Sequence, residues 1–465
     1  MSKDQPAPIR EEQKSKEITR RQLLKMGAGA GAISVIAGPK TFCNPGRAVE
    51  DGSAIKGLFD AKAGGDKEGK GMQPAIDTNV EPRNPLEAAT HPNPYPYYAK
   101  LVAERPLYWD PDMKLWVASG AEAVKSVMTS SICRVRPNGD PVPKHIKGSP
   151  AGDIFQQLVR QNDGQRHSDL REVTAAALSH ISTAIDEPSR HRAGALNQSL
   201  NPKDGGQKLN DFIFGLSVYV IADLLNLPES IMPMMCVWVN QLSRCFSPLS
   251  TPEQTEEGNA AAARLIDIFK ARESGHDKAQ GIGGARQADK SAEAANQIGF
   301  FTQSYEATAA LIGSTLLILA SNDELHSQIL ARPQALDGTL DEVLRYDSPV
   351  QNTRRFLSVN AAVAGKDMKE DESILVVFGA ANRDPSLNPE PQSFQPLRQN
   401  RQMFTFGLGA HACMGADWAK VIAKAGIAQL LHAGINLKRI SQSYAYRRSV
   451  NVRVPVFGAG ESAYK

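Results

Sequence analysis

The sequence predicts a mainly α-helical protein with a small β region, in which a single large domain follows a separate N-terminal segment. Apolar residues recur at helical spacing in several long segments, whereas only two short runs have the residue types of strands. Hydrophobic residues make up 41% and charged residues 22% of the 465 positions, as in ordinary globular proteins. This composition excludes wholesale disorder, a fibre and a polytopic membrane protein. A chain of this length can also bury a core large enough to enclose a cofactor.

The net positive charge of the chain comes from its N-terminal segment. Residues 1–25 carry seven basic and four acidic side chains, and this excess equals the net charge of +3. The rest of the chain is therefore neutral and lacks the basic surface that binds nucleic acids. We expect no nucleic-acid partner.

The N-terminal segment is typical of an export signal. Thr19–Lys25 reads TRRQLLK and contains the paired arginines of twin-arginine signals. The weakly apolar stretch behind it, Met26–Gly38, is too short and too rich in glycine to span a bilayer. We therefore predict a signal in residues 1–48, cleaved after Ala37 or Ala48, and a periplasmic location. A disordered basic tail on a cytoplasmic protein is the alternative.

The domain boundaries follow from composition. Residues 49–80 are rich in Gly, Asp and Lys and hold few large apolar side chains, so we predict a flexible linker. The main domain is then 81–465. Its most apolar run, 309–320, is shorter than the roughly 18 residues that a membrane span needs, and we predict a buried helix there and no stable membrane span.

The elements of the main domain follow from periodicity and from helix-breaking residues. Helices are predicted at Asp211–Leu227, which stops at Pro228, and at Asn296–Ser321, Asp323–Ala331, Leu336–Tyr346 and Ala416–His432. Strands are predicted at Leu115–Ala118 and Ser373–Phe378. After Phe378 the chain becomes irregular and rich in proline, and such a long irregular stretch in a compact domain is usually functional.

A cysteine follows this irregular stretch in a glycine-rich loop. Residues 406–415 read FGLGAHACMG, and glycines of this kind let the backbone approach a flat ligand closely. Cys413 lies just before the predicted helix 416–432, whose N-terminal N–H groups would stabilise a thiolate. A thiolate held in this way can be the proximal ligand of a haem iron. The alternative is a cysteine that packs as a small hydrophobic side chain, the usual case for a lone cysteine.

This loop resembles the haem-binding loop of the cytochrome P450 superfamily, and further motifs occur in the order of that family. Glu342–Arg345 matches its ExxR helix, within DEVLRYDSPVQ. The segments ANRDP at 381–385 and FQPLR at 394–398 resemble the region before its cysteine, and His167–Arg171 resembles its HxxxR. The resemblance covers roughly residues 93–455. It implies the P450 fold around haem b, with Cys413 as the metal ligand.

The resemblance also implies roles for other residues. The haem carboxylates would be held by His167, Arg171, His411 and one arginine of the pair 354/355, with Arg355 favoured and Arg354 the alternative. Two further loop positions of the motif, Phe406 and Gly409, are expected beside the cofactor. Glu342, Arg345 and Arg398 would form a structural ion network.

The helix expected to face the haem departs from the family pattern, which places a small residue, a glycine, any residue, an acid and two threonines in order. In this chain Ser304 replaces the glycine and Ala307 replaces the first threonine, while the acid is Glu306. That threonine supports proton delivery during oxygen activation, so Thr308, an ordered water or a substrate hydroxyl must replace it. Glu306, Ala307 and Thr308 are the candidate catalytic positions.

These residues predict a monooxygenase that oxidises a small apolar organic substrate. The substrate would lie among segment 130–165, segment 211–245 and the helix that faces the haem. The chain has no second cysteine cluster and no GxGxxG after a strand, so electrons would come from a separate donor protein. A peroxide-driven enzyme is the alternative, because Ala307 weakens proton delivery and export removes cytoplasmic donors. A haem sensor or electron-transfer protein is a further alternative.

Overall fold

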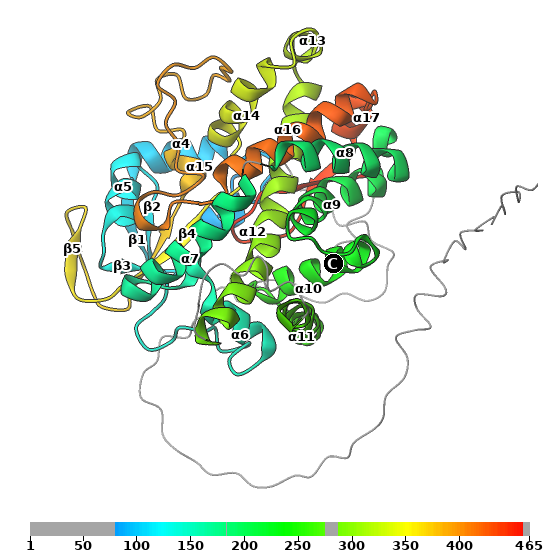
Figure 1. The fold of residues 1–465 in the computed structure, drawn as a ribbon. Helices are drawn as coiled ribbons and strands as arrows, with labels where there is room; N and C mark the ends of the chain where they lie inside the picture. Colours follow the sequence, from blue (N-terminus) through cyan, green and yellow to red (C-terminus); the bar gives the residue numbers. More distant parts are fainter. Residues whose placement is uncertain (1–79, 183, 275–286, 459–465) are drawn as a thin grey trace, which may run out of the picture. The chain divides into compact units, whose positions relative to one another are not determined.

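The structure is a computed structural model that describes residues 80–182, 184–274 and 287–458 (Figure 1). The predicted signal segment 1–48 and all but the last residue of the predicted linker 49–80 lie outside the described residues. The boundaries proposed for those two segments therefore stay predictions.

Helices make up most of the described chain, as the periodicity predicts. Their bounds are α3 (Pro85–Ala88), α4 (Tyr95–Glu104), α5 (Ala121–Thr129), α6 (Pro150–Gln157), α7 (Gly164–Ser182), α8 (Asp186–Leu200), α9 (Gly206–Leu224), α10 (Met232–Cys245), α11 (Pro252–Ser274), α12 (Gln287–Ala320), α13 (Asp323–Ala331), α14 (Ala335–Tyr346), α15 (Phe378–Ala381), α16 (Ala416–His432) and α17 (Leu437–Gln442). Short 3-10 turns are η1 (Val159–Gln161), η2 (Pro202–Asp204), η3 (Glu229–Ile231) and η4 (Gly409–His411).

The β region is small, also as predicted. A five-stranded sheet has the order β1-β2-β7-β4-β3, in which β2 and β7 are parallel and the other neighbours antiparallel. Its strands are β1 (Leu107–Asp110), β2 (Leu115–Ala118), β3 (Cys133–Arg134), β4 (Thr353–Leu357) and β7 (Ser373–Val376). Two hairpins complete the set, β5 (Ala361–Val363) with β6 (Lys366–Met368) and β8 (Tyr444–Tyr446) with β9 (Pro455–Phe457).

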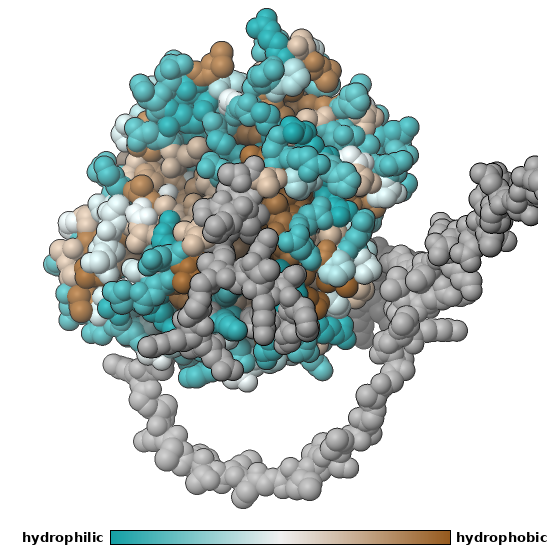
Figure 2. Space-filling view, in the orientation of Figure 1, coloured by the Kyte–Doolittle hydropathy of each residue, from teal (hydrophilic) through white to brown (hydrophobic). Residues whose placement is uncertain are grey.

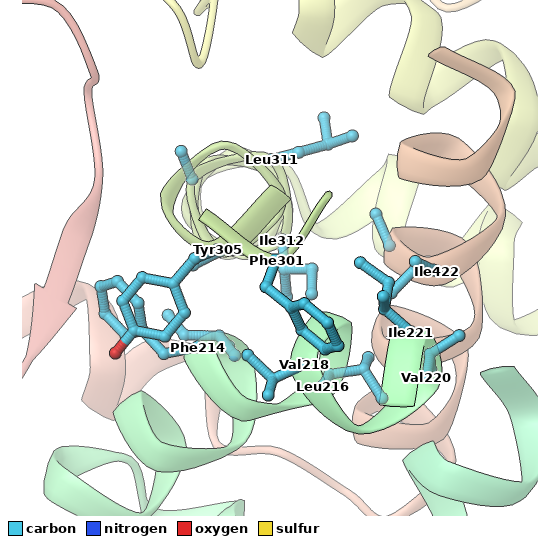
Figure 3. Packing of buried hydrophobic residues seen from close by; sticks show 14 of the residues in the cluster. Phe214, Leu216, Val218, Val220, Ile221, Phe301, Tyr305, Leu311, Ile312 and Ile422 are labelled. Carbon is cyan, nitrogen blue, oxygen red and sulfur yellow. The ribbon is translucent and has the colours of Figure 1, made fainter. Parts of the chain in front are cut away.

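Helix α12 lies in the middle of the helical part, with α8 and α9 on one side of it and the sheet on the other (Figure 1). It packs against α9 and α16 through side chains that are almost fully buried, such as Phe301, Ile312 and Leu216 (Figure 3). Burial on this scale is the main favourable term in folding. The helix is therefore rigidly held where it borders the site described below.

The sheet has its own apolar clusters. Residues of β2, β7 and α5, among them Val124, Ile374 and Val376, form one of them, while α4 with Tyr98 and Leu101 packs in another. Sheet register fixes side-chain direction, because neighbouring residues of a strand point to opposite faces. In β4, Arg354 pairs with Leu375 and Arg355 with Ile374.

Some boundaries differ from the sequence prediction. Helix α9 begins at Gly206 and ends at Leu224, because Asn226 adopts a left-handed conformation with φ 51° and reverses the chain before Pro228. Helix α12 begins nine residues before Asn296, at Gln287. Strand β7 ends at Val376, and Phe378 opens the short helix α15 in place of a strand end.

The face of the molecule in Figure 2 is mostly hydrophilic where its residues are coloured. Within the described ranges, no single helix has the length and apolarity of a membrane span. Helices α12 and α13 pass such a test only as a pair, and they are bent at 111° to each other.

Candidate active site

The cysteine loop is a tight turn that presents its thiol to a cavity. Gly407 and Gly409 have φ values of 72° and 70°, a region that favours glycine. The Cys413 N–H donates to the carbonyl of Phe406 at 2.8 Å, which closes the turn just before α16. The side chain of Cys413 is exposed and lines the cavity, together with Phe406.

Gly409 has a different place from the one expected. It is not among the residues that line the cavity. A Cβ at this position would lie 3.1 Å from the Met128 carbonyl oxygen, so Gly409 allows the loop to pass close to the end of α5. The structure therefore gives it a backbone role beside Met128 and Thr129.

The surroundings of Cys413 act on its thiol in opposite directions. Burial raises the pKa of Cys413, whereas the Gly415 backbone N–H and the cations of Arg160 and Arg171 lower it. Burial is the largest of these effects, so the pKa of Cys413 lies above its ordinary value, and the N–H group and the two cations only partly offset it. A bound metal ion would favour the thiolate, because a coordinating thiol is deprotonated.

The cavity has a volume of about 1040 Å³, at the upper end of the range for ligand sites of about 300–1,000 Å³. It can therefore hold a large cofactor with space beside it. Apart from Gly409, every predicted site residue lines it, and so does Arg354: His167, Arg171, Glu306, Ala307, Thr308, Arg354, Arg355, Phe406, His411 and Cys413. The fold thus brings together positions that are up to 246 residues apart in the sequence, from His167 to Cys413.

Cationic and imidazole groups gather beside the cysteine loop. The His167 and His411 rings lie 4.2 Å apart, centroid to centroid, and Arg171 donates to the Ala412 carbonyl at 3.0 Å. His411 Nε2 donates to Asp163 Oδ1 at 3.1 Å. Burial, His411 and Arg171 together lower the pKa of His167 to about 4, against an opposing effect of Asp163, so this ring is neutral at pH 7.

Arg355, rather than Arg354, is the more buried arginine of the pair, with 5% of its surface exposed. Burial lowers its pKa to about 10, with Arg160 acting in the same direction and Asp163 opposing it. The two arginines point to opposite faces of β4, as the register requires. This burial is consistent with the choice of Arg355, rather than Arg354, as the arginine that would contact a haem carboxylate.

Arg160 is a residue that sequence reasoning missed. It lies in η1, lines the cavity, and its cation acts on both Cys413 and Arg355. Burial lowers the pKa of Arg160 as well. A lone arginine between Val159 and Gln161 belongs to no motif, so only the fold could reveal it.

This arrangement fits a haem. Two buried ring nitrogens, His167 Nε2 and His411 Nδ1, have no hydrogen-bond partner within the described part of the chain. Together with Arg160, Arg171 and Arg355 they outnumber the single carboxylate nearby, Asp163, so the cluster can accept the two carboxylates of haem. The free thiol of Cys413 lines the same cavity and can serve as the metal ligand.

The α12 side of the cavity carries the altered positions. Ala307 lines it without a hydroxyl, and the buried Thr308 Oγ1 has no hydrogen-bond partner among the described residues. Ser304 donates to the Phe301 carbonyl at 3.2 Å, and α12 continues through this position. Glu306 has a partner that the motifs do not indicate, Arg447, whose Nη1 lies 3.3 Å from its Oε1.

The structural ion network has the predicted members and one more. Arg345 and Arg398 contact Glu342 Oε1 at 2.6 and 3.2 Å, and Arg401 contacts its Oε2 at 2.8 Å. Burial alone would raise the pKa of Glu342, but the hydrogen bonds from Arg345, Gln395 and Arg401 lower it below its ordinary value. The network fastens the irregular segment after Phe378 to α14.

The segments expected around the substrate do line the cavity, through Val135 to Gln161 and through Ile221, Ser243 and Arg244. The segment 445–452, which follows and includes the end of β8, also lines it and was not predicted. This segment lies beyond the last motif, so spacing alone gave no sign of it.

Residues 316–433, which include the ExxR helix and the cysteine loop, match the family model for cytochrome P450. The chain belongs to the cytochrome P450 family. Membership implies a haem-thiolate cofactor and monooxygenation of an organic substrate, so the predicted class of activity is confirmed.

Bacterial relatives support the assignment over most of this P450. It is 26% identical to a biotin biosynthesis cytochrome P450 of Bacillus subtilis, over 79% of this chain and 93% of the relative. It is 25% identical to the 6-deoxyerythronolide B hydroxylase of Saccharopolyspora erythraea, over 73% and 88%.

The fold agrees as well. The structure of P450BioI in complex with hexadec-9Z-enoic acid ligated acyl carrier protein superposes with a TM-score of 0.67 at 24% identity. That match covers 79% of this P450 and 98% of the solved chain. The predicted mainly helical domain with a small sheet is therefore confirmed.

Proposed function

We propose that this P450 oxidises a small, mainly apolar organic molecule, with haem b bound through Cys413. The observation that carries the proposal is that Cys413 and the Ser304–Thr308 stretch of α12 line one cavity. Apolar side chains such as Phe155 and Phe300 border the same space. They exclude water and leave the substrate class broad.

The residues on the two sides of the cavity have different roles. The carboxylates of the haem would be held by Arg171, Arg355, His167 and His411, and these contacts would set its orientation. A haem bound through a thiolate supplies oxygen-activating chemistry, since the thiolate pushes electron density in a way that favours O–O cleavage. On α12, Glu306 is the side chain able to take up and release protons.

The proposal is tested with the purified, haem-loaded protein. We expect the thiolate type of spectrum in the reduced, carbon monoxide-bound state, and product from apolar substrates when a surrogate ferredoxin and its reductase supply electrons. A spectrum of the thiolate type without product from any substrate or oxidant would favour the haem sensor or electron-transfer protein instead.

A second candidate, a peroxide-driven enzyme, is favoured by Ala307. Peroxide arrives with its O–O bond already reduced and needs less proton relay than dioxygen. Glu306 supports this candidate too, because it lines the cavity one position before Ala307 and is held there by Arg447, whose Nη1 lies 3.3 Å from its Oε1. Glu306 would then move a proton between the two peroxide oxygens.

The variants Ala307→Thr and Glu306→Ala separate the two oxidants. In a peroxide-driven enzyme, Ala307→Thr changes peroxide turnover little, while Glu306→Ala lowers it by about 10²-fold, as for loss of a general acid–base group. In a donor-dependent monooxygenase, Ala307→Thr raises the yield of product per electron consumed. Both variants are assayed with peroxide alone and with the surrogate donor. Product from the donor system with none from peroxide would exclude the peroxide-driven enzyme.

We also propose that the protein is exported to the periplasm by the twin-arginine route. The support is the TRRQLLK sequence at 19–25 followed by a short, weakly apolar stretch. An exported enzyme would meet a periplasmic donor or peroxide in place of cytoplasmic ferredoxins.

Replacement of Arg20 and Arg21 by lysine tests this route, because it preserves the charge and removes the arginine pair. We expect the double variant to fold, bind haem and stay in the cytoplasm, as measured by fractionation of cells that express it. The paired control is Lys14→Arg with Lys16→Arg, which should be exported like the parent. Equal export of the double lysine variant would contradict the proposal.

A further inference from the structure

Two arginines from distant segments lie near Glu306 in the cavity. Arg244 lies near the end of α10, and Arg447 follows β8 directly. Both line the cavity, as Glu306 of α12 does. The two cations are close enough that Arg447 lowers the pKa of Arg244. Like charges in such a place are unfavourable unless anions balance them.

The positive charge of Arg447 is balanced by Glu306. Its Nη2 donates to Asn240 Oδ1 at 2.9 Å, and its Nη1 lies 3.3 Å from Glu306 Oε1. Its guanidinium also stands 5.4 Å from the centroid of the Phe214 ring, which itself packs on Tyr305 at 5.0 Å (Figure 3). Since Arg447 is only 7% exposed, these contacts fix its position.

The positive charge of Arg244 is not balanced by an anionic partner. Within the described ranges, its guanidinium has no hydrogen bond or ion pair, although burial lowers its pKa. Two carboxylates act on it from a distance, Glu306 and Glu257. Glu257 is exposed on α11 and does not line the cavity, and Glu306 is engaged by Arg447. One positive charge is thus left over in this part of the cavity.

The haem does not account for this charge. The groups that fit its carboxylates, including His167, Arg171 and Arg355, gather beside the cysteine loop. Around Arg244 the lining includes the apolar side chains of Phe246 and Leu249 together with small polar ones such as Ser243, and no carboxylate besides Glu306 is in the described lining. A ligand that matches these surroundings has an apolar body and a single anionic end.

We propose that the substrates of this P450 are apolar organic acids, whose carboxylate is bound by Arg244 while Arg447 keeps Glu306 from competing for it. The inference rests on the proposed function and names its substrate class. A carboxylate can accept two parallel hydrogen bonds from a guanidinium, and bonds of this charged type are about twice as strong as neutral ones.

Binding is tested on the haem-loaded protein at pH 7 with four acids and their methyl esters. The acids are octanoic, dodecanoic, hexadecanoic and phenylacetic acid. Dissociation constants are taken from the ligand-induced shift of the haem absorbance and, independently, from the rise in melting temperature. Arg244→Gln removes the charge, Arg244→Lys keeps it, and Arg264→Gln is the matched control. Arg264 is an exposed arginine of α11 that does not line the cavity.

The parent is expected to bind at least one acid about tenfold or more tightly than its ester. Arg244→Gln should abolish that preference while ester binding changes little, and Arg244→Lys and Arg264→Gln should keep it. Equal binding of acid and ester in all four pairs would overturn the inference, and so would an unchanged preference in Arg244→Gln. Oxidation of the esters would in that case leave the proposed function intact, whereas no product from acids or esters would count against that function.

Discussion

At the scale of single residues, Cys413 is distinguished by where its side chain lies. The other described cysteines pack against protein: Cys133 and Cys245 are buried, and burial raises the pKa of Cys236 to about 12. Cys413 instead lines the cavity and has Arg160, Arg171 and a backbone N–H acting on its thiol. The environment, rather than the residue type, makes it the candidate metal ligand.

Cys413→Ala is therefore expected to abolish the thiolate type of spectrum in the reduced, carbon monoxide-bound protein. Haem itself can still enter, because the groups that hold its carboxylates remain. Cys236→Ala, which removes a thiol that does not line the cavity, should leave the spectrum unchanged. Retention of the parent spectrum in Cys413→Ala would refute the assignment of the ligand.

At the scale of elements, helix α14 positions the long irregular segment that leads to the cysteine loop. Glu342 and Arg345 are both fully buried, and Arg345 also donates to the carbonyls of Pro391 and Ser393 at 2.9 and 3.1 Å. A segment with so little regular structure cannot satisfy its own backbone groups. The arginines supply those bonds, and Glu342 balances their charge.

Glu342→Gln is expected to destabilise the protein by about 3–5 kcal/mol at pH 7, because buried arginines lose their counter-charge. Glu342 has a folded-state pKa below its ordinary value, so its contribution is present above the ordinary pKa and is lost as pH falls through the lowered one. The stability gap between parent and variant should therefore narrow in acid. Urea unfolding followed by circular dichroism measures the gap at each pH.

The matched control is Glu87→Gln, which breaks the partly exposed ion pair with Arg83 and should change stability by about 1 kcal/mol or less. Equal stability of parent and Glu342→Gln at pH 7 would show that the network does not support the fold. If the difference in stability between the parent and Glu342→Gln stayed constant as the pH is lowered, that difference would not depend on the charge of Glu342.

The sequence was most informative where structure is local. Helices α13 and α16 have the predicted bounds because their periodicity ends at residues that stop or cap a helix, such as Asn322, which accepts from Leu325 N at 3.0 Å. Motif residues such as His167 and Arg355 could be found because a family pattern fixes their spacing. Arg160, Arg244 and Arg447 could not, because their place depends on tertiary packing between segments that share no motif.

At the scale of the whole described body, the cavity has many cations and few carboxylates. The arginines that line it are Arg136, Arg160, Arg171, Arg244, Arg354, Arg355, Arg447 and Arg448, while Glu306 is the one carboxylate in the described lining. They come from η1, α7, α10 and β4, as well as from loops, one of which follows β8. Folding therefore brings like charges together, and anionic groups bound between them would reduce their repulsion.

This charge balance predicts a difference between the haem-free and haem-loaded proteins. Burial is the main cause of the lowered pKa of Arg355, and Arg160 lowers it further, so the two arginines repel each other without haem, while Asp163 opposes this effect. Salt screens such repulsion, with a Debye length of about 30 Å at 0.01 M and about 3 Å at 1 M. The melting temperature of the haem-free protein should therefore rise with sodium chloride concentration more steeply than that of the haem-loaded protein, in which the haem carboxylates already neutralise the cluster. Arg355→Gln should reduce the slope in the haem-free form alone, and equal slopes in the two forms would contradict the balance.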